Sequence, residues 1–353
     1  MSTITAAAQP RLGNSLAPPR PEWLAKVQEE VLEPQLPIVD PHHHLWERGD
    51  GMVYMYRDLL EDCRAGHNIV ATVFIDCRSM YRKDGPQEMR PIGETEFVNG
   101  VAAMYASGSY GPTRACAGIV SYADLRLGGR VREVLEAQIA AGNGRFRGIR
   151  YATGWDRHQE IRRTHTNPPQ GLMADTTWRE GFTQLGKLGL TFDAWLYHPQ
   201  LGELGDLAAA FPDVPIILDH VGGPLGYGPY ASRHKEEFAA WKKGMTELAR
   251  RQNVTVKVGG LGMPMGWLDF YAQPAPPTSQ KLADAFRPWV ESCIEIFGPT
   301  RCMFESNFPV DKVTSSYAVL WNAFKRLTAK ASAADKTALY AGTAARVYKL
   351  VLI

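Results

Sequence analysis

Short apolar runs rich in β-branched residues alternate along the chain with amphipathic segments of helical length. The predicted strands occupy residues 37–44, 68–76, 115–122, 145–151, 190–197, 214–220, 253–259 and 301–307. The predicted helices lie near residues 57–65, 95–106, 129–141, 177–187, 201–210, 235–251, 281–297 and 315–329. Repeated strand–helix alternation is typical of a parallel sheet. Eight such units predict an α/β protein whose sheet closes into a (β/α)8 TIM barrel.

Two long segments interrupt this alternation. Residues 152–175 follow the fourth predicted strand, and residues 261–279 follow the seventh. Loops of this length are usually functional or disordered, and the aromatic residues of 261–279 favour a packed loop. We therefore expect both insertions to lie over the rim of the barrel as lid-like loops. Residues 1–36 predict a Pro-rich N-terminal arm, ahead of a single barrel domain at residues 37–353.

Polar side chains end every predicted strand. In a barrel the carboxyl ends of all strands meet at one rim, where barrel enzymes do their chemistry. The side chains at these ends are His42 and His44, Asp76 and Arg78, Tyr122 and Asp124, Arg150, Tyr197 and His198, Asp219 and His220, Lys257, and Glu305 and Asn307. We therefore expect groups that are scattered along the chain to converge in one pocket.

The densest cluster of titratable groups is the run I-V-D-P-H-H-H-L-W at residues 38–46. Side chains alternate faces along a strand, so Asp40, His42 and His44 are predicted to share one face, and His43 to point the other way as a structural residue. Two imidazoles on one face can hold a single metal ion or a substrate carboxylate. Because burying such groups unpaired is costly, we predict that His42 and His44 form part of a functional site.

Composition narrows the classes of function. The chain has 353 residues, of which 45% are hydrophobic and 22% charged, and a formal net charge of +2. These values are ordinary for a globular protein and give no reason to expect nucleic acid or a membrane as a partner. Five cysteines without a CxxC pair predict reduced thiols, as in the cytoplasm. We expect a cytoplasmic protein that acts on a small molecule, and the Pro-rich arm leaves a homo-oligomer open.

An ordered series of motifs resembles the amidohydrolase superfamily, family 2. The motifs are D-x-H-x-H at 40–44, F-R-G-I-R ending at Arg150, H-P-Q-L at 198–201, F-P-D-x-x-I-I-L-D-H ending at His220, M-F-E-S-N-F-P-V at 303–310 and G-T-A-A-R-V-Y at 342–348. The series is similar to the branch of 2-pyrone-4,6-dicarboxylate lactonase and the sugar-acid lactonases. The same group includes non-oxidative decarboxylases. The resemblance implies a (β/α)8 barrel, a metal or substrate site at His42 and His44, a sixth-strand histidine at His220, and a carboxylate clamp at Arg150.

The last predicted strand departs from the pattern of the family that it resembles. Members usually carry G-S-D-W-P or a close variant there, and the aspartate binds metal or activates water. Here the segment is E-S-N-F-P, so that Asn307 stands at the aspartate position and Glu305 at the glycine position. Period-two alternation would turn both side chains the same way. We therefore hypothesise that Glu305 supplies the missing carboxylate.

The remaining polar strand ends have less specific interpretations. His198 is a candidate fourth ligand or substrate contact, and Tyr197 a candidate hydrogen-bonding partner of the substrate. Lys257 either binds substrate or forms an ion pair with Glu305 inside the barrel. Asp219 is expected to face the helix layer and to orient a neighbour.

The leading functional hypothesis is hydrolysis of a lactone, or a similar cyclic ester, that carries a carboxylate. A general base must deprotonate the attacking water, and Glu305 is the first candidate, with His220 second. A zinc ion on His42 and His44 would acidify the water. In a metal-independent enzyme the histidines and Arg150 would polarise the carbonyl themselves. The alternatives are a non-oxidative decarboxylase and a ligand-binding barrel without turnover, which Asn307 would favour.

Overall fold

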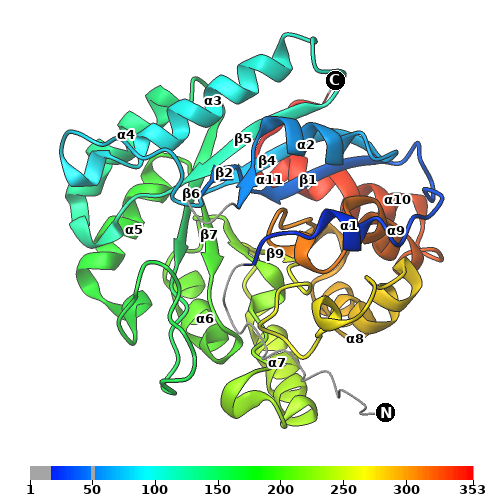
Figure 1. The fold of residues 1–353 in the computed structure, drawn as a ribbon. Coiled ribbons are helices and arrows are strands. Elements are labelled where there is room, and N and C mark those ends of the chain that lie inside the picture. Colours follow the sequence, from blue (N-terminus) through cyan, green and yellow to red (C-terminus); the bar gives the residue numbers. More distant parts are fainter. Residues whose placement is uncertain (1–16, 49–51, 353) are drawn as a thin grey trace, which may run out of the picture.

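The structure is a computed structural model that describes residues 17–48 and 52–352. Eight parallel strands form one sheet in chain order: β1 (Pro37–His43), β4 (Asn68–Ile75), β5 (Arg114–Ser121), β6 (Phe146–Ala152), β7 (Thr191–Trp195), β8 (Ile216–Leu218), β9 (Val254–Val258) and β10 (Cys302–Phe304). The segment after β10 returns to β1, because His44 N donates to the Phe308 carbonyl (2.8 Å) and Asn307 N donates to the His42 carbonyl (2.9 Å). The sheet is therefore a nearly closed barrel, as the strand–helix alternation predicted (Figure 1).

Helices connect the strands and surround the barrel. The principal ones are α2 (Tyr56–Cys63), α3 (Ile92–Ala106), α4 (Val131–Ala141), α5 (Thr176–Lys187), α6 (Leu201–Ala210), α7 (His234–Leu248), α8 (Ser279–Phe297) and α9 (Tyr317–Leu327). Several begin at a capping side chain, such as Asp175, which accepts from Trp178 N at 2.8 Å, and Ser316, which accepts from Val319 N. Such caps satisfy backbone N–H groups that a helix leaves free at its first turn. The eight predicted helices are confirmed with small changes at their ends.

Smaller elements complete the fold at both ends of the chain. They are α1 (Pro21–Leu24), the antiparallel pair β2 (Trp46–Glu47) and β3 (Val53–Tyr54), and the C-terminal helices α10 (Ala333–Thr337) and α11 (Thr343–Val347). Val347 of α11 and the following residue, Tyr348, close the amino-terminal end of the barrel. Tyr348 and Val347 pack there with inward side chains of the strands, such as Val39, Ile217 and Met303. The polar centre therefore lies at the opposite, carboxyl ends of the strands.

The N-terminal arm lies against the second insertion. The predicted arm includes residues 1–16, which lie outside the described residues. In the part that is described, Trp23 Nε1 donates to the Gln273 carbonyl at 2.8 Å, and Lys26 donates to the Pro274 carbonyl at 2.9 Å. Among the described helices, none is long and apolar enough to cross a membrane.

Candidate active site

A pocket of about 630 Å³ opens at the carboxyl ends of the strands. Its lining consists of His44, Trp46, Arg48, Cys77, Arg78, Arg150, Arg162, Arg163, Thr164, His165, Trp195, His220, Met263, Asn307 and Val310. Residues 162–165 come from the first predicted insertion and Met263 from the second. Both insertions therefore contribute to the walls of the pocket, whereas their closing as lids stays a prediction.

Below this pocket, Glu305 lies between two imidazoles. Its Oε1 is 2.7 Å from Nδ1 of His220, and its Oε2 is 2.9 Å from Nδ1 of His42. The centroids of the two imidazole rings are 4.5 Å apart. All three side chains are buried. A carboxylate that contacts an imidazole on each side is held in one orientation, so this group is organised before any substrate arrives.

The backbone at this centre adopts conformations that few residues other than glycine take. His220 and Val221 follow β8 with φ angles of 54° and 47°, and Asn307 follows β10 with φ 54°. For a β-branched residue such as Val221 this is a true outlier. Strained backbone of this kind concentrates at functional sites. Because of this backbone turn, the His220 side chain lies toward Glu305. Simple alternation along a continuing strand would have directed it to the other face.

A buried ammonium group lies one step further into the barrel. Lys257 Nζ is 2.7 Å from Asp193 Oδ1 and 3.1 Å from Asp219 Oδ1, and it is 3.2 Å from His42 Nδ1. Burial raises the pKa of Asp193 to about 6, although Lys257 acts to lower it. The prediction that Asp219 faces the helix layer is wrong, because its carboxylate points into the barrel. The sequence predicted an ion pair between Lys257 and Glu305, whereas in the structure the ion-pair partners of Lys257 are Asp193 and Asp219.

His44 and Arg150 form another part of the pocket floor. Nδ1 of His44 is 2.8 Å from the Ile75 carbonyl, which can only accept, so this nitrogen carries the proton and Nε2 of the neutral ring keeps its lone pair. Arg150 lies 3.5 Å from a carboxylate oxygen of Asp76 and also donates to the Asp76 backbone carbonyl. Burial alone would raise the pKa of Asp76, but His165 and Arg150 hold it below its usual range. Asp76 therefore stays ionised and fixes Arg150.

The imidazoles of His42 and His44 are both neutral at pH 7. Burial, and then the charge of Lys257, hold the pKa of His42 well below its usual range. Burial, and then Arg150, have the same effect on the pKa of His44. A neutral imidazole keeps a lone pair that can bind a metal ion or accept a proton. This is the form that the proposed roles of the two histidines require.

His42, His220 and Glu305 fit a divalent metal ion. Each offers one ligand atom, and these atoms lie within 4.8 Å of one another. Two imidazole nitrogens and one carboxylate oxygen are a donor set typical of zinc. Although Glu305 Oε2 is near His42, it makes no hydrogen bond within the described residues, so its lone pairs remain available. His44 is not part of this group of three, whereas the sequence paired it with His42 as a metal ligand.

The first predicted strand does not place its polar residues as simple alternation requires. An irregularity in the pairing with β4 lies between Asp40 and His43. Asp40 therefore bonds to Ser306 Oγ (2.6 Å) and to Tyr317 of α9 (2.9 Å), and the prediction that it shares a face with His42 is wrong. His43 contacts Thr72 at 2.8 Å, in keeping with its predicted structural role.

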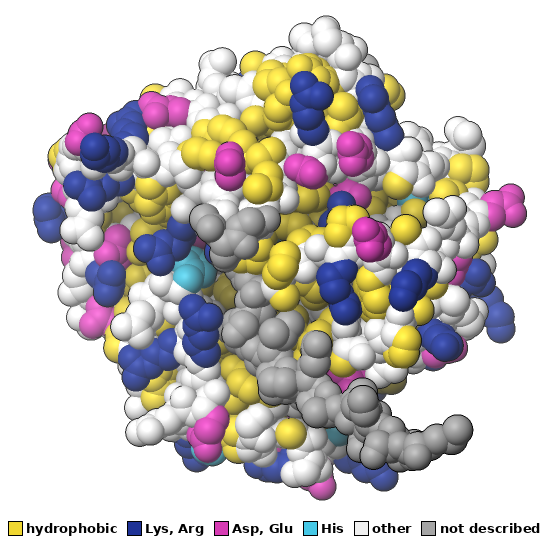
Figure 2. Space-filling model, in the orientation of Figure 1, with side chains coloured by type: hydrophobic (Ala, Val, Ile, Leu, Met, Phe, Trp, Pro, Cys, Tyr) yellow, Lys and Arg dark blue, Asp and Glu magenta, His cyan; other side chains and the backbone are white. Residues whose placement is uncertain are grey.

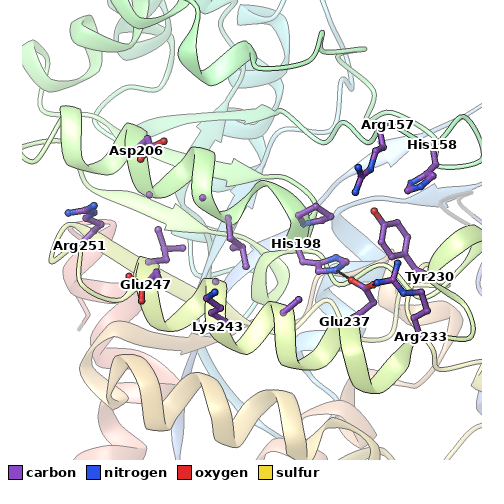
Figure 3. A pocket seen from close by; sticks show the side chains of 17 residues that line it. Arg157, His158, His198, Asp206, Tyr230, Arg233, Glu237, Lys243, Glu247 and Arg251 are labelled. Atoms are coloured by element: carbon purple, nitrogen blue, oxygen red, sulfur yellow. Dashed lines mark hydrogen bonds and ion pairs between the residues drawn. The ribbon is translucent and has the colours of Figure 1, made fainter.

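Two other predicted site residues lie away from the centre. Tyr197 donates its hydroxyl to the Arg162 carbonyl at 2.5 Å. His198 contacts Glu237 at 3.0 Å and lines a separate groove of about 570 Å³ between α6 and α7 (Figure 3). The structure therefore does not bring either residue to the pocket of His44 and Arg150. Asn307 does line that pocket, but its amide donates to Asp311 at 2.7 Å.

The polar ends of the predicted strands do not account for several residues of the site. Asp193 lies in the middle of β7, where a lone acid in an apolar run was the available signal. Trp46 belongs to the two-residue strand β2, and Arg48 follows it. Such a strand is too short to produce an alternating pattern in the sequence. Asp76 and Arg78 end a predicted strand, but the sequence indicates no particular role for them. The wall of the pocket near residues 162–165 depends on loop conformation, which periodicity does not encode.

The fold and the buried histidine–carboxylate centre define the class of protein, which is a barrel enzyme. A family model described as amidohydrolase matches residues 39–350. The chain therefore belongs to the amidohydrolase family, and the resemblance seen in its motifs is confirmed.

Two relatives are similar to this protein over most of the chain. It is 34% identical over 335 residues to an uncharacterized protein of Sinorhizobium fredii, covering 89% of this chain and 98% of the relative. It is 25% identical over 326 residues to an L-fucono-1,5-lactonase of Burkholderia multivorans, covering 88% and 96%.

Solved structures share the fold at lower identity. An amidohydrolase from B. multivorans with bound zinc has a TM-score of 0.67 at 22% identity, covering 89% of this chain and 99% of that one. A 5-carboxyvanillate decarboxylase from Novosphingobium aromaticivorans, complexed with manganese, has a TM-score of 0.55 at 12% identity, covering 90% and 97%. The neighbours thus include both hydrolases and decarboxylases, and metal-bound examples of the fold.

Proposed function

We propose that this protein hydrolyses a lactone, or a similar cyclic ester, of a small molecule that bears a carboxylate. The observation that carries the proposal is the position of Glu305 between His42 and His220 beneath a pocket that also contains Arg150. The lactonase named among the relatives supports the same reaction class.

Each step of the hydrolysis has a residue of suitable chemistry. The guanidinium of Arg150 binds the substrate carboxylate, since its planar fork matches two carboxylate oxygens. Glu305 accepts a proton from the attacking water and, as the resulting carboxylic acid, returns it to the leaving oxygen, while His220 at 2.7 Å orients the carboxylate. His42, His220 and Glu305 would hold a divalent metal ion, which when bound acidifies water and polarises the carbonyl.

The test replaces Glu305 by glutamine and measures acid release from a panel of carboxylate-bearing lactones. We expect kcat to fall by about 10²–10⁴-fold, the usual contribution of a general base. Glu237→Gln is the matched control, because Glu237 is also a buried carboxylate beside a histidine but lies in the other groove. Full activity of Glu305→Gln would end the proposal.

A decarboxylase is the second candidate, because decarboxylases of this fold are among the structural neighbours. A decarboxylase would use the same cationic pocket to hold its substrate and would need a proton donor at the carbon that loses carbon dioxide. The two reactions differ in their products. Release of carbon dioxide without consumption of water, measured by infrared gas analysis and by ¹⁸O incorporation, would favour the decarboxylase over the lactonase.

A further inference from the structure

The lining of the central pocket is strongly cationic. It contains five arginines and no aspartate or glutamate, and they are Arg48, Arg78, Arg150, Arg162 and Arg163. The whole chain has a formal net charge of only +2, so positive charge is concentrated here. On the face drawn in Figure 2, several dark-blue side chains gather around a histidine beside a hollow. Such a concentration favours a negatively charged occupant.

The contacts of these arginines leave most of their charge unmatched. Arg48 donates to the Cys77 carbonyl at 3.2 Å, and Arg78 donates to the His165 carbonyl at 3.1 Å. Carbonyl groups orient a guanidinium but do not neutralise it. Within residues 17–48 and 52–352, Arg150 is the one arginine of this lining with a carboxylate within 4.0 Å. The pocket therefore has room for more than one anionic group.

Two of the guanidinium groups are held in place before substrate binds. The guanidinium of Arg48 lies 4.3 Å from the centroid of Trp46, whose ring in turn stacks on His44 with centroids 5.4 Å apart. Arg150 is 5% exposed and is fixed by Asp76, yet its Nε has no hydrogen-bond partner among the described residues. A buried donor without a partner is costly, and a carboxylate oxygen of a ligand would satisfy it.

We propose that the substrate carries at least two anionic groups, one bound by Arg150 at the floor of the pocket and the second by Arg48 near its mouth. This inference rests on the proposed function only in assigning the substrate to this pocket. It separates the chain from an enzyme for neutral sugar lactones, because a neutral ligand would leave the second guanidinium buried under ligand without a counter-charge. The stack of His44, Trp46 and Arg48 gives the second group a defined position.

The test measures binding and needs no turnover. Malonate, glutarate and pimelate are titrated into the purified protein by isothermal calorimetry, beside pentanoate, which matches glutarate in length but has one carboxylate. We expect the best dicarboxylate to bind at least about tenfold more tightly than pentanoate, because each charge-assisted pair adds affinity. The difference should shrink in 0.5 M salt, which is about the ionic strength that screens exposed pairs.

Variants assign the second anionic group to Arg48. In Arg48→Gln, the preference for the dicarboxylate over pentanoate should fall to about twofold or less, and Arg48→Lys should retain part of it. Arg132→Gln is the control, because Arg132 is an exposed arginine of α4 that pairs with Glu136. Equal binding of mono- and dicarboxylates by the wild type, or an unchanged preference in a folded Arg48→Gln, would overturn the inference. Dicarboxylate binding without hydrolysis of any lactone would contradict the proposed reaction but not the inference.

Discussion

Replacing Lys257 by methionine tests how the carboxylates inside the barrel are kept in place. The ammonium group is fully buried and contacts Asp193 at 2.7 Å and Asp219 at 3.1 Å. Methionine has nearly the same length, so the packing changes little, whereas both ion pairs are lost. Removing one partner of a buried ion pair costs about 3–5 kcal/mol, because it leaves an uncompensated charge. We expect a loss of that size in the free energy of unfolding at pH 8.

The loss should depend on pH with a predictable sign. The folded-state pKa of Asp193, about 6, already lies above its ordinary value of 3.8. A carboxyl group with a raised pKa favours the folded state most at low pH, and this contribution is lost as the pH rises from about 4 through about 6. Without Lys257, which acts to lower that pKa, protonation becomes easier still. The variant should therefore recover about 1–3 kcal/mol of its deficit between pH 8 and pH 5.

Urea denaturation measures both effects, followed by tryptophan fluorescence and far-ultraviolet circular dichroism at pH 5 and pH 8. The double variant Lys257→Met/Asp193→Asn is the control, since it removes a charge together with its partner. It should be more stable than Lys257→Met alone. A deficit of less than about 1 kcal/mol at pH 8, or one that is equal at both pH values, would refute the electrostatic reasoning.

Two further predictions separate the central site from the groove of His198. His198→Ala should destabilise the protein by about 1–3 kcal/mol in thermal melting, because Glu237 loses its buried partner at 3.0 Å. Its kcat/KM should stay within about threefold of the wild type, and a loss beyond about thirtyfold would return His198 to the substrate site. After zinc loading and gel filtration, elemental analysis should find close to one equivalent in His198→Ala and less than about one tenth in His42→Ala and His220→Ala. Full zinc content in His42→Ala would contradict the metal site.

The barrel could be predicted from the sequence because its strands carry strong apolar signals. The predicted strand at 68–76 and the observed β4 (Asn68–Ile75) differ by one residue. The strand predicted at 214–220 is observed only at β8 (Ile216–Leu218). The chain leaves the ladder there because His220 and Val221 turn to positive φ, and an apolar pattern cannot reveal such a turn at residues other than glycine.

The residues of the site could be predicted where they lie at the ends of strands. They could not be predicted where the backbone departs from the regular alternation of side chains along a strand. His42, His220 and Glu305 converge as the ordered strand ends indicated. Asp40 does not share the face of His42, because an irregularity in the pairing of β1 lies between Asp40 and His43. Asp219 faces into the barrel because alternation places it on the same side as Ile217, two residues earlier, which packs inside the barrel. The wall formed by residues 162–165 depends on long-range contacts of a loop, and no local sequence signal reports these.

The departure at the last strand is accommodated by the neighbouring strand, which argues that Glu305 has a role of its own. A Cβ atom on Gly259, just after β9, would lie 2.4 Å from Cγ of Glu305. The absence of a side chain at this position is therefore what allows the longer acid to enter the centre. Glu305 then reaches both imidazoles from one layer below Asn307, whose amide is engaged with Asp311. The carboxylate of Glu305, the space that it occupies and its two imidazole partners come from different strands and agree in position. Although residue 307 is an asparagine, the centre therefore still has a carboxylate that can serve as base or ligand.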